Sequence, residues 1–204
     1  LEHQQVLGAW SLLAQKGTGD LGRKDALEFL HKQGKSLAGL DLSNAHLVGL
    51  KLKGADLTGC NFTGANLRGV VFEQCGFQYA IFDKCDMTNV TFVKCGLRDR
   101  TFKECNLQFA KFVQSNCNWA IFRCCDLMQA DFSGCLFDEP TFEQCFVYRY
   151  PILPVAPEGY EFVFDQNEDV VLLFLVSLSI GAILFFYFLF KENVLSLKSK
   201  GSVV

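Results

Sequence analysis

The chain carries almost no excess charge of either sign, because 19 Lys and Arg residues stand against 22 Asp and Glu residues. A formal net charge of −3 gives no strong overall field to attract nucleic acid or an anionic surface. We therefore expect no nucleic-acid partner. Histidine is also scarce, and His3, His31 and His46 all precede the cysteine-rich part of the chain. A mixed Cys/His zinc site among the later cysteines is therefore not indicated.

Motifs of catalysis are missing as well. The sequence has no nucleophile–base pair, phosphate-binding glycine loop or carboxylate pair that meets the geometric demands of a reaction. The short run Gly17–Gly19 is too short for a phosphate loop and indicates a flexible joint. We predict a protein that is not an enzyme, has no cofactor and no bound metal, and takes no evident small-molecule substrate.

A period of five residues runs through the middle of the chain without a break in frame. Starting at Leu37, every fifth residue up to Val147 is Leu, Phe or Met, except Cys117 and Val147 itself. Two residues before most of these large residues lies a small one, Ala, Cys, Val or Ser. Five fits neither the helical period nor a simple strand alternation. It indicates a coil with one corner per five residues, which sends one large and one small side chain inward from each face.

Segments such as Ala55-Asp56-Leu57-Thr58-Gly59 and Ala65-Asn66-Leu67-Arg68-Gly69 resemble the A(D/N)LXX unit of the pentapeptide-repeat family. The resemblance covers residues 35–149 and implies an all-β solenoid, a right-handed quadrilateral β-helix with four faces per coil. Some family members mimic DNA and bind gyrase through an acidic surface. Here 12 basic residues balance 12 acidic ones over 35–149, which argues against that role.

Ten cysteines would be typical of a disulfide scaffold in a small secreted protein, but their spacing indicates another use. Eight of them take the small inward position of the repeat: Cys60, Cys75, Cys85, Cys95, Cys105, Cys125, Cys135 and Cys145. One interpretation is a ladder for metal or redox chemistry. The interpretation that we favour is packing, because Cys behaves as a small hydrophobic residue and zinc needs ligands around a point rather than along a line.

Both ends of the solenoid differ from its middle. Residues 1–34 predict a helical cap, with one helix over 2–15 that buries Val6, Leu7, Trp10, Leu13 and Ala14, and a second from Arg23 to Gln33. Residues 150–169 form a Pro-rich and then acidic linker. A cap at each terminus is expected of any solenoid.

Residues 170–190 contain no charge and would span about 31 Å as a helix, the thickness of a bilayer core. We predict a single transmembrane helix there, followed by a short polar tail over 191–204. The basic tail favours an exoplasmic or lumenal β-helix, with Leu1 as a processed end. A tail anchor with a cytosolic β-helix is the alternative, since no signal-peptide pattern is visible.

A surface for a partner is predicted from the 20-residue coil. Tyr79 and Trp119 share one outward column, and Ile81 and Ile121 share the column around the corner. Arg100 lies between these columns at a position that elsewhere holds small residues, so we expect its guanidinium to turn outward toward Tyr79 or Trp119. Scattered surface aromatics are the alternative interpretation.

The sequence therefore predicts a non-enzymatic, membrane-anchored scaffold or interaction module. Its expected partners are the lipid bilayer and other subunits of a membrane complex, which it would serve as an accessory or assembly subunit. Two alternatives are a regulatory protein that binds a soluble enzyme through its β-helix, and a metal or redox protein that uses the cysteine ladder.

Overall fold

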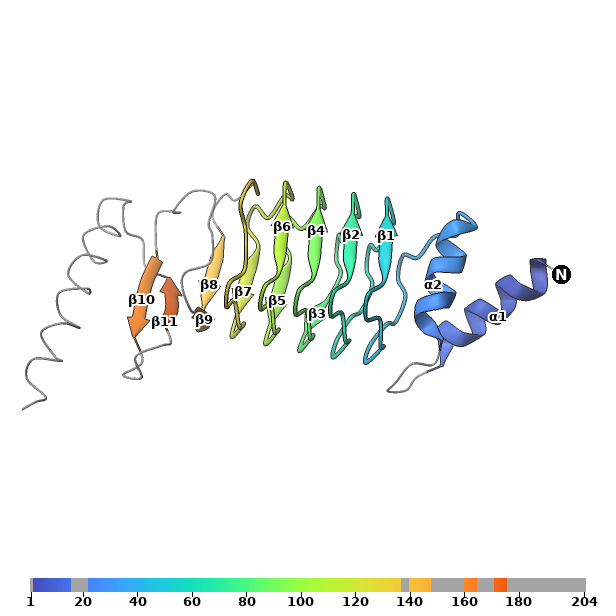
Figure 1. The fold of residues 1–204 in the computed structure, drawn as a ribbon, viewed down its shortest axis with the longest axis horizontal. Coiled ribbons are helices and arrows are strands. Elements are labelled where there is room, and N and C mark those ends of the chain that lie inside the picture. The colour runs from blue at the N-terminus through green and yellow to red at the C-terminus, as the bar shows by residue number, and fades with distance from the viewer. Residues whose placement is uncertain (1, 16–21, 137–139, 148–159, 165–170, 176–204) are drawn as a thin grey trace, which may run out of the picture.

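A stack of short parallel strands forms the body of the protein, with two helices at its N-terminal end (Figure 1). The computed structural model describes residues 2–15, 22–136, 140–147, 160–164 and 171–175. The helices are α1 (Glu2–Ala14) and α2 (Arg23–Lys32). One sheet contains β1 (Lys51–Lys53), β2 (Val71–Glu73), β4 (Thr91–Val93) and β6 (Lys111–Val113). A second contains β3 (Phe82–Asp83), β5 (Thr101–Lys103), β7 (Ile121–Arg123) and β8 (Thr141–Glu143).

Within these two sheets, every strand pairs in parallel with the strand one coil away, 20 residues along the chain. Phe72 is opposite Phe92 in the first sheet, and Phe82 is opposite Phe102 in the second. Isolated parallel bridges with the same 20-residue offset, such as Asn66 with Asp86, connect the coils elsewhere. This repeat of four five-residue faces confirms the predicted all-β solenoid.

The interior consists of the residues that the five-residue frame selects. All of its large positions that the structure describes with side chains, from Leu37 to Phe142, are at most 3% exposed. The small positions from Ala45 to Cys145 are buried with them, apart from Arg100. The predicted inward core is therefore confirmed.

Phenylalanine fills two opposite faces of this interior. One column contains Phe62, Phe82, Phe102, Phe122 and Phe142, and the other contains Phe72, Phe92, Phe112 and Phe132. Rings within a column stack in parallel, as in Phe102 and Phe122 with centroids 5.0 Å apart and planes 4° apart. Rings from opposite columns meet edge to face, as in Phe102 and Phe112 at 6.0 Å and 86°. Both arrangements suit the aromatic quadrupole, so the rings add to the burial energy.

Each corner of the coil requires a residue with positive φ. This residue lies two positions after each large one, and in the early coils it is usually glycine, as at Gly59 (φ 69°) and Gly69 (φ 62°). From Gln74 onward the described corners are non-glycine except for Gly134. A side chain in this conformation costs about 1–2 kcal/mol, so the stacking of the coils must hold these corners in place.

The two helices cover the first coil. The buried side chains of α1 are Ala9 and Leu13, whereas Leu7 is 55% exposed and Ala14 is exposed, so the predicted stripe was wrong at these two residues. The helix is turned so that its small Ala9 faces α2. Arg23, the first residue of α2, is buried, and its guanidinium donates to the Gln15 carbonyl and, over 3.1 Å, to the Ser43 carbonyl.

The C-terminal end differs from the sequence prediction. There β9 (Cys145–Val147), β10 (Tyr160–Phe164) and β11 (Val171–Leu175) form an antiparallel sheet in the order β10-β11-β9. Hence Val171–Leu175, the predicted start of a transmembrane helix, is a strand, and β10 lies within the predicted linker. An uncharged apolar run suits a paired strand as well as a helix. No helix among the described residues is long and apolar enough to cross a bilayer, and 176–190 lies outside them.

Replacement of Phe92 by Ala tests the aromatic interior. The Phe92 ring stacks between those of Phe72 and Phe112, so the cavity left by its removal should lower the free energy of unfolding by about 3–5 kcal/mol. Denaturant unfolding measures the effect, with the exposed Gln78→Ala as a control expected to change stability by less than about 0.5 kcal/mol. A loss for Phe92→Ala as small as that of the control would contradict the described core.

Candidate functional site

Apolar side chains are exposed along one corner of the β-helix. We define the aromatic edge as Tyr79, Ile81, Arg100, Trp119 and Ile121, the five residues predicted to contact a partner. Tyr79 is 75% exposed, Ile81 is 51% exposed and Trp119 is 36% exposed, while Ile121 is half-buried. These residues come from three successive coils, and the corner holds them on one side of the solenoid.

Arg100 lies in the middle of the aromatic edge. It occupies a small inward position between Ala80 and Ala120 of the neighbouring coils, yet it is only half-buried. Its Nε donates to the Arg98 carbonyl over 3.1 Å, and its Cζ lies 5.8 Å from the centroid of the Tyr79 ring. The guanidinium has therefore left the apolar interior and lies near Tyr79, as the sequence predicts.

Arg98 was missed in the sequence. Its Cζ lies 3.9 Å from the centroid of the Trp119 ring, a closer cation–π contact than that of Arg100, and its Nε lies 3.5 Å from Asp99 Oδ2. The two residues are 21 positions apart, one coil and one residue. A comparison of adjacent outward columns, and not only of residues in one column, would have predicted this contact.

The backbone of the aromatic edge is strained where its aromatic residues sit. Tyr79 has φ 58° and Trp119 has φ 57°. In the same corner column the earlier coils have Gly39 and Gly59, which adopt this conformation without a steric penalty. Two large aromatic residues therefore occupy corner positions that disfavour them and expose their rings to solvent. Other corners from Gln74 onward are also non-glycine with positive φ, so what distinguishes Tyr79 and Trp119 is the large aromatic ring that each exposes.

The buried cysteines have a local structural role. Each of them except Cys117 donates from Sγ to the carbonyl 23 residues earlier, as Cys85 does to Phe62 over 3.0 Å and Cys125 to Phe102 over 3.2 Å. Ser115 makes the same bond to the Phe92 carbonyl at 3.2 Å. All ten cysteines are free thiols, and the described residues hold no group of three or more His, Cys, Asp or Glu side chains arranged for a metal ion.

Alkaline pH should destabilise the protein through the Cys60 thiol. Burial raises the pKa of Cys60 from 9.0 to about 11, so the folded state keeps a proton that the unfolded state loses above pH 9. The free energy of unfolding should therefore fall as the pH rises from 9 to 11. Denaturant unfolding at each pH measures this fall, and it should be shallower in Cys60→Ser. Equal slopes for the two proteins would contradict the assignment.

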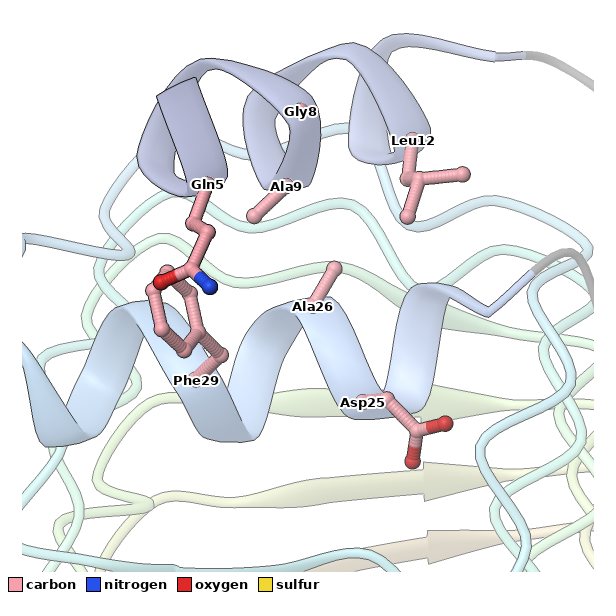
Figure 2. Close-up of a pocket in the computed structure, with 7 residues that line it drawn as sticks. All are labelled: Gln5, Gly8, Ala9, Leu12, Asp25, Ala26 and Phe29. Carbon is pink, nitrogen blue, oxygen red and sulfur yellow. The ribbon is translucent and has the colours of Figure 1, made fainter. Parts of the chain in front are cut away.

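A shallow groove lies between α1 and α2, at the N-terminal end of the molecule. Its volume is about 370 Å³, and it is lined by Gln5, Gly8, Ala9, Leu12, Asp25, Ala26 and Phe29. Figure 2 shows the apolar side chains of both helices along it, with one amide and one carboxylate. These groups offer no nucleophile beside a base, so the groove is best explained as the seam between two helices.

Known proteins place the chain in a family. The family described as "Pentapeptide repeat region" matches residues 75–148, and that described as "Pentapeptide repeats (8 copies)" matches residues 36–74 and 55–92. Together these matches cover residues 36–148, more than half of the chain. No curated protein matches the chain.

Several solved structures are similar to parts of the chain. The pentapeptide-repeat protein Rfr23 of the cyanobacterium Cyanothece 51142 is 15% identical, with a TM-score of 0.45 over 64% of this chain and 99% of its own. A pentapeptide-repeat protein of the Arabidopsis thaliana thylakoid lumen is 25% identical, with a TM-score of 0.39 over 49% of this chain and 66% of its own. QnrB1, a plasmid-mediated fluoroquinolone resistance protein, is 22% identical, with a TM-score of 0.39 over 53% and 58%.

The family matches coincide with the part of the chain that has the five-residue frame, the 20-residue coil and the buried Leu and Phe columns. This chain belongs to the pentapeptide-repeat family.

Proposed function

We propose that the chain is a non-enzymatic interaction module that binds a partner protein through its aromatic edge. The observation that carries the proposal is the exposure of the Tyr79 and Trp119 rings in one corner column, one coil to either side of the half-buried Arg100. Exposed apolar side chains that gather at one place on a surface are typical of a protein interface, where their burial contributes binding energy.

The composition of the edge supports the same proposal. Tyr, Trp and Arg are the residue types that dominate binding energy at protein interfaces. Here Arg98 lies against Trp119 and Arg100 against Tyr79, with Ile81 exposed beside them. The edge extends over two coil spacings, roughly 10 Å, on a scaffold that is rigid because each coil is bonded to the next. A rigid surface loses little conformational entropy on binding.

The double variant Tyr79→Gly/Trp119→Gly separates binding from folding. Glycine removes both rings and relieves both corners, so the free energy of unfolding should stay equal or rise, whereas co-purification with the native partner in mild detergent should fall at least tenfold. Phe109→Gly is the matched control, since Phe109 is a 37% exposed aromatic with φ 58° at another corner column. Partner yield equal to wild type in the double variant would exclude the aromatic edge as the docking surface.

We also propose that the module works as an accessory or assembly subunit of a membrane complex, attached through the uncharged segment 170–190. The support is the sequence of this segment, which contains 21 residues without charge, and the basic tail that follows it. The tail favours an exoplasmic or lumenal position for the β-helix. The strand β11 occupies Val171–Leu175 of this segment, so a membrane helix over all 21 residues would require β11 to unpair.

Vesicle flotation tests the attachment. The full chain should float with phospholipid vesicles at high salt, and Ile180→Asp/Leu184→Asp should stay at the bottom of the gradient because charge in the bilayer core is costly. Ser177→Asp/Ser179→Asp serves as a milder comparison, expected to lose less of its binding. Protease protection in sealed vesicles of known orientation then reports the side. Failure of the full chain to float would contradict the proposed attachment.

A further inference from the structure

Two glycines lie one coil apart on the face next to the aromatic edge. Gly76 forms a parallel bridge with Gly96, and Gly96 forms one with Asn116. They occupy the outward position just before the large inward residue. From Asp41 to Thr141 every other residue at this position has a side chain, so Gly76 and Gly96 form a strip of bare backbone, which we call the glycine strip.

Nothing within the described part of the chain requires glycine at either position. Neither residue has a φ in the left-handed region, and a Cβ added to either would meet no atom within 4 Å. Glycine also weakens a strand, because it has more conformational freedom to lose on folding. A strand glycine that its own chain does not need is typical of a place where another backbone approaches closely.

The glycine strip also gives up a local hydrogen bond. Elsewhere in the same column Asp56 Oδ1 accepts the N–H of Thr58 over 3.0 Å, and Asn116 Oδ1 accepts the N–H of Asn118 over 3.1 Å. Such Asx turns stabilise the corner that follows. Gly76 and Gly96, which lie between these two residues in the stack, lack the side chain that would accept this bond.

Arg100 supplies the charge beside the strip. Its guanidinium contacts the Tyr79 ring and the Arg98 carbonyl, and it forms no ion pair with any carboxylate of the residues that the structure describes. Arg98, by contrast, has Asp99 as its counter-ion. A half-buried guanidinium without a counter-ion favours an anionic partner, and a carboxylate is the group that its planar fork fits in a peptide.

Resting on the proposed function, these observations define the chemistry of the partner. We propose that the glycine strip binds an extended acidic segment of a partner protein. The backbone of the segment lies flat over Gly76 and Gly96, an Asp or Glu of the segment pairs with Arg100, and an adjacent apolar side chain packs against Tyr79. The bare backbone provides close approach, and the guanidinium provides the preference for acidic sequences.

A random linear dodecamer peptide library, displayed and selected on the immobilised full chain, is the probe. The recovered peptides should be enriched in Asp or Glu next to an apolar residue. Their synthetic forms should bind Gly96→Asn at least tenfold more weakly than wild type, because the new side chain covers the strip. Gly96→Asn should nevertheless unfold at an equal or higher denaturant concentration, since it restores the acceptor that Asp56 and Asn116 provide. Gly8→Ala on α1 is the control and should bind normally.

Arg100→Gln tests the charge. An acidic peptide should lose at least tenfold in affinity for Arg100→Gln, whereas its Asn or Gln counterpart should bind wild type and variant alike, which isolates the pair in a double-mutant cycle. Recovery of no peptide, recovery of peptides without acidic residues, or full binding to Gly96→Asn would each overturn the inference. If the recovered peptides fail these criteria but still lose affinity for Tyr79→Gly/Trp119→Gly, the proposed function stands without this partner chemistry. If those peptides bind the double variant as tightly as wild type, both proposals fail.

Discussion

The stacking of each coil on the next, in register every 20 residues, is the constraint on which the rest of the structure depends. No single coil can bury its own large residues, so stability comes from the contacts between neighbouring coils. Phe82 lies on Phe102 and Phe102 on Phe122, while backbone bonds such as that from Asn106 to the Cys85 carbonyl fix the register. The same columns that hold the interior therefore align the outward residues.

This alignment explains how the exterior can carry function while the interior columns stay intact. Inward positions are restricted to a few residue types, whereas outward positions hold many types and can vary. Tyr79 and Trp119 expose large rings at corners where the earlier coils have glycine, and in the same region the glycine strip forgoes a local hydrogen bond. Departures that reduce stability and gather on one side of the scaffold favour a binding surface over chance.

The frame of five residues was enough to predict the solenoid and its buried side chains, because burial there depends only on position. The frame also predicted that the Arg100 guanidinium lies near Tyr79. The frame did not predict the positive φ of the corners. Residues as different as Gln74, Lys94 and Trp119 adopt it, so no residue type marks these positions. The strand at Val171–Leu175 was missed because an uncharged run suits a paired strand as well as a membrane helix.

Hydrogen exchange with and without a selected peptide tests most directly the claim that the aromatic edge and the glycine strip form the binding surface. Without peptide, amides of the interior coils should be the slowest to exchange, because their opening requires loss of the stack. With peptide, added protection should be confined to segments 76–81, 96–101 and 116–121. Protection centred on the groove between α1 and α2, or on the corner column of Phe109, would contradict the account.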